Sequence, residues 1–180
     1  LADCEAIYVF SGSHDERVMD FYYTLTARMD LHFGDTKEGM FAIRVPEPMR
    51  ADKAGGHILS STGRVDDKTW GAPARWVDYS GRVKTDNDKL YGISILIHPE
   101  SFNANGRWHV RTYGLFAHNP IGVKDFPKFD DASPDEKKGG VHLKNGEVMR
   151  LAYRVILHRD AFNLEQGNAR WEQFSQSKLP

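Results

Sequence analysis

The chain has 180 residues, of which 40% are hydrophobic and 27% charged, the composition of an ordinary globular domain. Its 25 acidic and 24 basic residues leave a formal net charge of −1 with the signs interspersed, which excludes the basic stripe typical of nucleic-acid binders. The single cysteine, Cys4, excludes an internal disulfide, and no stretch approaches the roughly 20 apolar residues of a membrane span. We therefore expect one domain over residues 1–180, with no nucleic-acid partner and no membrane span.

The first third of the chain contains three strand-like runs, AIYVF, VMDFYYTLTARM and MFAIRV, rich in β-branched and aromatic residues. The third run follows HFGDTKEG, in which Asp35, Lys37 and Glu38 lie between Gly34 and Gly39. A loop that brings two carboxylates and an ammonium to a strand entrance suits general acid/base chemistry on a hydroxyl, an anomeric carbon or an acidic C–H. A plain charged hairpin loop is the alternative.

The next cluster is WGAPARWVDYSG, from Trp70 to Gly81. Its two tryptophans, with Arg75, Asp78 and Tyr79, resemble an aromatic platform with a hydrogen-bonding rim, which is how proteins bind sugar rings. The alternative is that the tryptophans are core residues, and it is stronger for Trp76 because this residue lies in an alternating strand.

Two later runs alternate clearly. LYGISILIH places Ile93, Ile95 and Ile97 on one face of a strand, and Ser94, Leu96 and His98 on the other. NGRWHVRTYGLFAHNP spaces three polar side chains at every second position, so an extended strand would present them in one row: His109, Arg111 and Tyr113. That row is either a site or the solvent-facing side of a sheet.

The remaining segments predict two hairpin turns, a long loop and a short helix. The turns are KTDNDK and LKNGEV, and the loop runs from Gly122 to Gly140, mobile or in contact with a partner rather than a catalytic lid. A last strand, VMRLAYRVILH, precedes a helix in which Leu164, Trp171 and Phe174 would face inward after an Asp160 or Asn168 cap. The whole pattern predicts an all-β antiparallel sandwich with a short C-terminal helix.

Eight histidines raise the question of a metal. The strong zinc spacings, His-Glu-x-x-His and paired Cys-x-x-Cys, are absent, so a site could come only from folding, with His98, His109 and a carboxylate as its ligands. We predict no metal ligand, and the sequence indicates no cofactor. A Gly-x-Ser-x-Gly elbow and Gly-rich phosphate loops are also absent, which argues against nucleophilic catalysis of that type and against nucleotide-dependent transfer.

Four segments together resemble the PmoA-like family of unknown function, labelled methane oxygenase PmoA: FGDTKEGMFAIRV, WVDYSG, HPESFNANGRWHVRTYGLFAHNPIG and LAYRVILHR. The resemblance implies a bacterial protein that matches the C-terminal part of a longer one, with a fold like half of a mutarotase-type supersandwich and an association with sugars. It points to Asp35, Lys37, Glu38, Asp78, Tyr79, His98, His109, Arg111 and Tyr113. ESFNANGR lacks the second histidine often found there, and the label does not suit a chain without membrane spans.

The leading hypothesis is a carbohydrate-active protein, a lyase, hydrolase or epimerase, that acts on a small-molecule or oligosaccharide ligand. Glu38 or His109 would be acid or base, Arg111 would hold a carboxylate or hydroxyl, and Trp70 or Trp76 would stack on the ring. The alternatives are a non-catalytic carbohydrate-binding or assembly module and, less favoured, a metal enzyme using His98, His109 and Glu38. A homo-oligomer, an upstream half or a partner chain, and a periplasmic, secreted or cytoplasmic location, all stay open.

Overall fold

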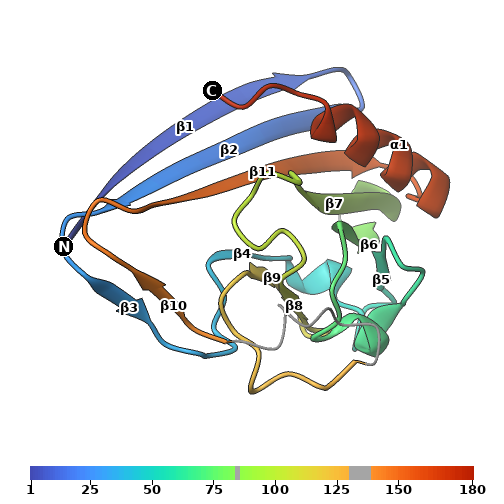
Figure 1. Cartoon of the computed structure of the whole chain (residues 1–180). Coiled ribbons are helices and arrows are strands. Elements are labelled where there is room, and N and C mark those ends of the chain that lie inside the picture. Colours follow the sequence, from blue (N-terminus) through green and yellow to red (C-terminus); the bar gives the residue numbers. More distant parts are fainter. Residues whose placement is uncertain (84–85, 130–138) are drawn as a thin grey trace.

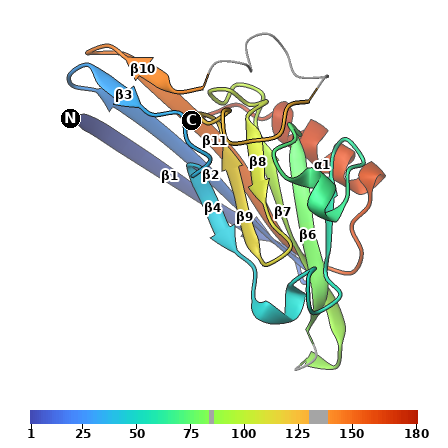
Figure 2. The ribbon, with the colours of Figure 1, turned by 90° about the horizontal axis from the view of Figure 1, so that it is seen from below.

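The computed structural model describes residues 1–83, 86–129 and 139–180, and its main element is a six-stranded antiparallel sheet (Figure 1). Its strands, in spatial order, are β1 (Ala2–Gly12), β2 (Glu16–Ala27), β11 (Val148–Arg159), β7 (Lys89–Ile97), β6 (Trp76–Val83) and β5 (His57–Ser60). A three-stranded antiparallel sheet covers part of one face, in the order β4 (Phe41–Arg44), β9 (Leu115–Asn119) and β8 (Arg107–Val110) (Figure 2). The shorter elements are β3 (Leu31–Phe33), which pairs with β10 (Val141–Leu143), the 3-10 helices η1 (Glu47–Met49) and η2 (Asp66–Thr69), and α1 (Leu164–Ser175).

The main core lies between the two sheets, because alternation sends the odd-numbered residues of β6 and β7 towards the three-stranded sheet. Tyr79 and Ile95 are fully buried there against Trp108 and Phe116. Two packed antiparallel sheets with one C-terminal helix confirm the predicted all-β sandwich. The prediction that Ile93, Ile95 and Ile97 share one face is also confirmed.

The even-numbered residues of the same strands face α1, which covers the opposite side of the six-stranded sheet (Figure 1). Trp76 and Leu96 pack there with Phe174 of the helix. Asn163 caps α1: its side chain accepts a hydrogen bond from the Gln166 N–H, and the Gln166 side chain accepts one from the Asn163 N–H. The central strands of the six-stranded sheet are therefore covered on both faces.

The predicted helix is present, but its details differ from the prediction. Its cap is Asn163, since Asp160 has a left-handed φ of 66° outside the helix and Asn168 lies within it. Phe174 is fully buried as expected, whereas Leu164 in the first turn is 42% exposed.

The run WHVRTYGLFA does not form one strand, which corrects the predicted row of three side chains. β8 ends at Val110 and β9 begins at Leu115. The Gly114 N–H donates to the Arg111 carbonyl and the Arg111 N–H to the Leu115 carbonyl, and Gly114 has a φ of 101° that favours glycine. Tyr113 is therefore a turn residue, although it lies beside Arg111 as described below.

Of the two predicted turns, one joins paired strands. β6 and β7 pair from Val83↔Lys89 onwards, so KTDNDK does close a hairpin, although residues 84–85 lie outside the described part. LKNGEV forms a turn with Gly146 at φ 89°, but it is not a hairpin: β10 pairs with β3, and β11 with β2. Most of the predicted loop from Gly122 to Gly140, residues 130–138, lies outside the described residues.

β1 is exposed along its whole length and pairs, among the described residues, only with β2. A free edge of this kind is a ready template for another strand, and the predicted homo-oligomer or partner chain stays a prediction. Within the described ranges no helix combines the length and apolar character that crossing a membrane requires.

Candidate functional site

The polar side chains that the structure brings together lie on the outer face of the three-stranded sheet. Trp108 and Val110 of β8 point into the core between the sheets, so His109 points the other way. The same alternation in β4 buries Phe41 and turns Arg44 outwards. We call the side chains gathered on this face the outer-face cluster, which comprises Lys37, Glu38, Arg44, Trp70, His109, Arg111, Tyr113 and Phe126.

The loop with Asp35, Lys37 and Glu38 is held on this face by three anchors. The Asn119 side chain donates from Nδ2 to the Thr36 carbonyl at 2.8 Å, and His109 Nδ1 lies 2.9 Å from the Lys37 carbonyl. Asp35 Oδ1 accepts from the backbone N–H groups of Val123 and Lys124 at 2.7 and 3.2 Å. Asp35 thus positions the loop, and one oxygen of its carboxylate, Oδ1, already accepts two hydrogen bonds.

The surroundings of His109 favour its neutral form. Burial is the main cause that lowers the pKa of His109 below 6.5, and the hydrogen bond to Lys37 and the charge of Glu38 only partly oppose it. A neutral imidazole can bond to a carbonyl only by donating, so Nδ1 carries the proton and Nε2 keeps a lone pair. Among the described residues no group bonds to Nε2. Lys37, Glu38 and Arg111 are near enough to act electrostatically on the ring.

Beside His109, cationic and aromatic side chains alternate. The Arg111 guanidinium carbon lies 4.6 Å from the centroid of the Trp70 ring and 5.6 Å from that of Tyr113, and the Arg44 guanidinium lies 6.0 Å from the Tyr113 centroid. The Phe126 ring meets both Trp70 and His109 edge-on. Tyr113 is 37% exposed, whereas one face of Trp70 is covered by Arg111. Tyr113 is thus the more exposed of the two rings, although Arg111 and Arg44 both approach it, and Trp70 supports Arg111.

Four predicted ligand-binding residues are elsewhere, which corrects that part of the sequence prediction. Trp76 and Tyr79 are fully buried on opposite faces of β6, because adjacent odd and even positions of a strand point to opposite sides. The Tyr79 hydroxyl donates to the Thr112 carbonyl and accepts from the Ala51 N–H. His98 is buried against Phe174 and lies 3.2 Å from the Ser177 carbonyl, and Asp78 is buried under the α1 face.

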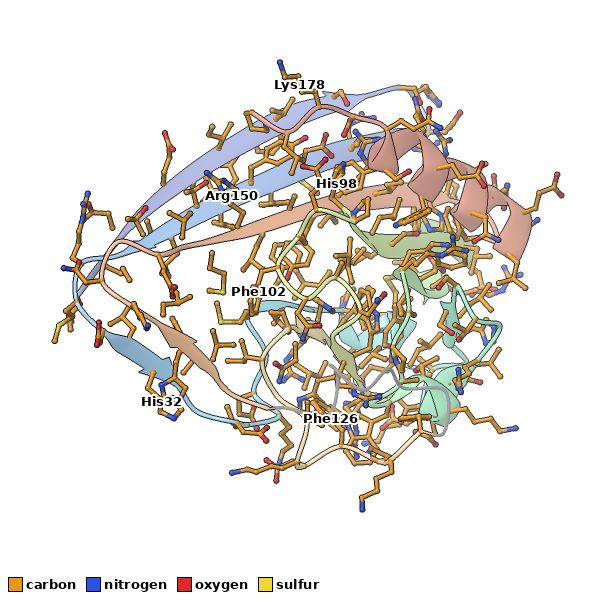
Figure 3. All side chains as sticks on the ribbon, in the orientation of Figure 1. His32, His98, Phe102, Phe126, Arg150 and Lys178 are labelled. Atoms are coloured by element: carbon orange, nitrogen blue, oxygen red, sulfur yellow. The ribbon has the colours of Figure 1, made fainter. Side chains whose placement is uncertain are left out.

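The metal interpretation that joins His98, His109 and Glu38 is contradicted by the same layering. His98 lies on the α1 side of the six-stranded sheet, while Phe126, whose ring contacts His109, lies at the opposite side of the molecule (Figure 3). Over the described ranges, no three side chains of His, Cys, Asp or Glu are placed to hold a metal ion.

Asp78 belongs to a buried polar group. His158 Nε2 and Ser94 Oγ lie 2.7 and 2.6 Å from the same oxygen, Asp78 Oδ1. All three residues are at most 5% exposed, and the Phe162 ring stacks on His158. Because Ser94 bonds to the carboxylate and not to the imidazole, the set lacks the serine–histidine bond of a nucleophilic triad. It is a structural cluster.

The His158–Asp78 pair makes the stability of the fold depend on pH in a defined direction. Burial lowers the pKa of His158, but the hydrogen bond and charge of Asp78 outweigh it, and the net pKa is raised above 6.5. The stabilisation is therefore complete below pH 6.5 and is lost as the pH rises through the higher folded-state value, by at most about 1.4 kcal/mol per pH unit. Urea unfolding at about pH 6 and about pH 8 should show this loss, and His158→Gln should remove it. If the free energy of unfolding changed with pH to the same extent in the wild type and in His158→Gln, the assignment to this pair would be contradicted.

Sequence reasoning did not identify Arg44, Phe126 or Asn119. Arg44 carried a usable signal, since it lies two positions from Ala42 in a strand whose Phe41 and Ile43 face the core. Phe126 and Asn119 come from a loop and a strand end whose positions depend on the packing of the two sheets, so no local pattern indicates them.

Two hollows elsewhere contain none of the predicted residues. One, of about 340 Å³, lies at the end of the six-stranded sheet between Met49, Tyr91 and Leu157, and the other, of about 250 Å³, is an apolar groove near Leu25 and Met149. The first hollow is also lined by His14, Arg17 and Arg159, but His14 and Arg159 pair with Asp15 and Arg17 donates to backbone carbonyls. The second has no charged residue in its lining, so the outer-face cluster is the better candidate site.

Residues 5–172 match the family described as "Family of unknown function (DUF6807)". The chain belongs to this family. No curated protein and no solved structure shows a significant match. The DUF6807 match leaves the resemblance to the PmoA-like family a prediction, and the function has to be argued from the outer-face cluster itself.

Proposed function

We propose that this DUF6807 member binds a saccharide at the outer-face cluster and that His109 removes a proton from it. The proposal depends above all on one observation: a neutral His109, with Nδ1 fixed on the Lys37 carbonyl and Nε2 unbonded, lies beside the cation and aromatic series that ends in exposed Tyr113. The lowered pKa of His109 keeps the ring in its basic form at neutral pH.

The positions of the carboxylates favour proton abstraction, as in a lyase or an epimerase, over hydrolysis. Hydrolysis of a glycoside needs two carboxyl groups facing each other across the bond. Asp35 is engaged by two backbone N–H groups through Oδ1, which leaves Glu38 as the carboxylate without such a role at the cluster, as far as the described residues go. Glu38 is exposed and near His109, a position suited to receive or return a proton.

A non-catalytic carbohydrate-binding module is the second candidate. It is favoured by the exposed Tyr113 ring, which is sufficient to stack on a sugar without any chemistry. The two candidates differ in what His109 contributes: the first needs its free Nε2, and the second does not.

The distinguishing experiment uses His109→Gln, which keeps a group able to donate to the Lys37 carbonyl and removes the titratable base. We expect turnover of a panel of native and oxidised glycosides to fall about 100-fold or more, while binding by calorimetry changes little. Wild-type turnover should rise with pH through the lowered pKa of His109, below 6.5, and then level off.

The matched control is His14→Gln, a histidine exposed at the distant end of the six-stranded sheet, which should leave turnover unchanged. Saccharide binding without turnover in the wild type would establish the module. Turnover that survives His109→Gln would show that another group is the base, and absence of both binding and turnover over the panel would contradict the proposal.

A further inference from the structure

Arg111 is a half-buried cation whose position is fixed by rings. Its guanidinium lies between Trp70 at 4.6 Å and Tyr113 at 5.6 Å, and Arg44 approaches the same Tyr113 ring at 6.0 Å. Cation–π contacts orient a guanidinium without using its N–H donors, which point outwards in the plane of the group. Two sets of donors are therefore presented around one exposed phenol ring.

Neither arginine has a carboxylate partner in the described part of the chain, unlike Arg154 and Arg50, which are held by two-oxygen ion pairs. Arg154 is bound by both oxygens of Asp20 at 2.7 and 2.8 Å, and Arg50 by both oxygens of Asp52 at 3.0 and 2.6 Å. Arg44 and Arg111 make no such pair. Within the described ranges no group bonds to their guanidinium donors, which can therefore bind an anion from solution.

The surrounding charges agree with this. Lys37 and Arg111 are the cations that act on His109, and Glu38 is the carboxylate that acts on the same ring. A ligand anion would meet Arg44 and Arg111 beside Tyr113, with His109 next to Arg111. A carboxylate bound by a guanidinium also makes the neighbouring C–H of a sugar more acidic, which is the proton that the base at His109 would take.

We propose that Arg44 and Arg111 bind an acidic group of the saccharide, a carboxylate or a sulfate ester, so that the ligand is an acidic rather than a neutral sugar. This inference rests on the proposed function and names the substrate class of the same site. It assigns a role to Arg44, which supplies charge and hydrogen bonds to the ligand from outside the proton-transfer step.

Calorimetric titration with matched pairs of oligosaccharides tests it: a uronate oligomer, the neutral oligomer of the same linkage, and the sulfated form of the neutral one. We expect the wild-type protein to bind at least one acidic form about tenfold tighter than the neutral form, with a preference that weakens at high salt. The uronate and sulfate arms tell which acidic group the site takes.

Arg44→Gln and Arg111→Gln should each abolish the acidic preference, while Arg150→Gln keeps it. Arg150 is an exposed arginine on β11, far from Phe126, so this control makes the same charge change away from the site (Figure 3). Thermal melting of each variant verifies folding, and Arg44, being exposed, keeps the test valid if the half-buried Arg111 is needed for the fold.

The outcomes separate this inference from the proposed function. Equal binding of acidic and neutral sugars, or an acidic preference that survives both substitutions, overturns the inference and leaves saccharide binding intact. Tighter binding of a single-stranded oligonucleotide than of any acidic sugar overturns the inference as well. Absence of binding to every sugar overturns both proposals.

Discussion

Replacing Asp78 with alanine is expected to lower the free energy of unfolding by about 3 kcal/mol, which would be a large part of the 5–15 kcal/mol typical of a domain. The substitution removes Asp78 Oδ1, the oxygen that accepts hydrogen bonds from both His158 Nε2 and Ser94 Oγ. Both donors would stay buried without an acceptor, and His158 could escape part of the cost only by giving up its proton. Urea unfolding at about pH 6, below the raised pKa of His158, measures the loss.

A second His–Asp pair in the same protein is the matched control. His14 Nδ1 lies 2.8 Å from Asp15 Oδ1, almost the separation of the buried pair, but both side chains are more than 60% exposed. Asp15→Ala should therefore change stability by no more than about 0.5 kcal/mol. Asp78→Asn, which keeps a carbonyl oxygen at the same position, should cost less than Asp78→Ala. Equal losses for Asp78→Ala and Asp15→Ala would contradict the view that burial makes Asp78 important.

The sandwich could be predicted from the sequence because the central strands alternate. LYGISILIH separates Ile95 from Leu96 by period alone, and the structure places them in different cores. What alternation could not show is that the second face is also covered. A strand face with Ser94 and His98 is expected to face solvent, yet both residues are buried on the side covered by α1. That helix lies more than 60 residues further along the sequence, so no local pattern in the strand indicates it.

The candidate site was partly predictable for the same reason. The loop with Lys37 and Glu38 and the residues His109 and Arg111 do meet, but the contacts that join them, such as His109 to the Lys37 carbonyl, span 72 positions. The error in WVDYSG came from treating neighbours in sequence as neighbours in space: Asp78 and Tyr79 are adjacent in a strand and so lie on opposite faces. The turn at Gly114 was missed because local preference for a strand outweighed one glycine.

Two of the three described histidines with shifted pKa values, His158 and His109, show how the fold assigns different roles to one residue type. His158 is buried with a carboxylate, so its charged form is favoured and its contribution is to stability. His109 is buried with a carbonyl and near cations, so its neutral form is favoured and one nitrogen stays free. Chemistry at neutral pH is open to the second arrangement and closed to the first.

Trp76 and Trp70, the two tryptophans predicted to stack on a sugar, differ in the same way: one is a core residue and the other belongs to the outer-face cluster. The second large effect that we expect is therefore on stability, at Trp76. Trp76→Ala should destabilise the fold by about 4 kcal/mol, because the indole is fully buried against α1 and donates to Asn168 Oδ1 at 3.1 Å. A Cβ on Gly167 would collide with the same ring, so Gly167→Ala should also destabilise. Thermal and urea unfolding measure both losses.

Trp70→Ala should reduce ligand binding more than stability, the reverse of Trp76→Ala. Its half-buried ring contacts Arg111 and Phe126, so we expect a stability loss of about 1 kcal/mol and a weakened hold on Arg111. Binding of acidic saccharides, measured by calorimetry on the folded variant, should fall with Trp70→Ala and be retained by Gly167→Ala wherever that variant folds. If Trp70→Ala binds acidic saccharides as the wild type does, Arg111 is oriented without the indole. If Gly167→Ala loses binding while it stays folded, the α1 layer and the outer-face cluster are coupled, and the two faces of the sandwich are not independent.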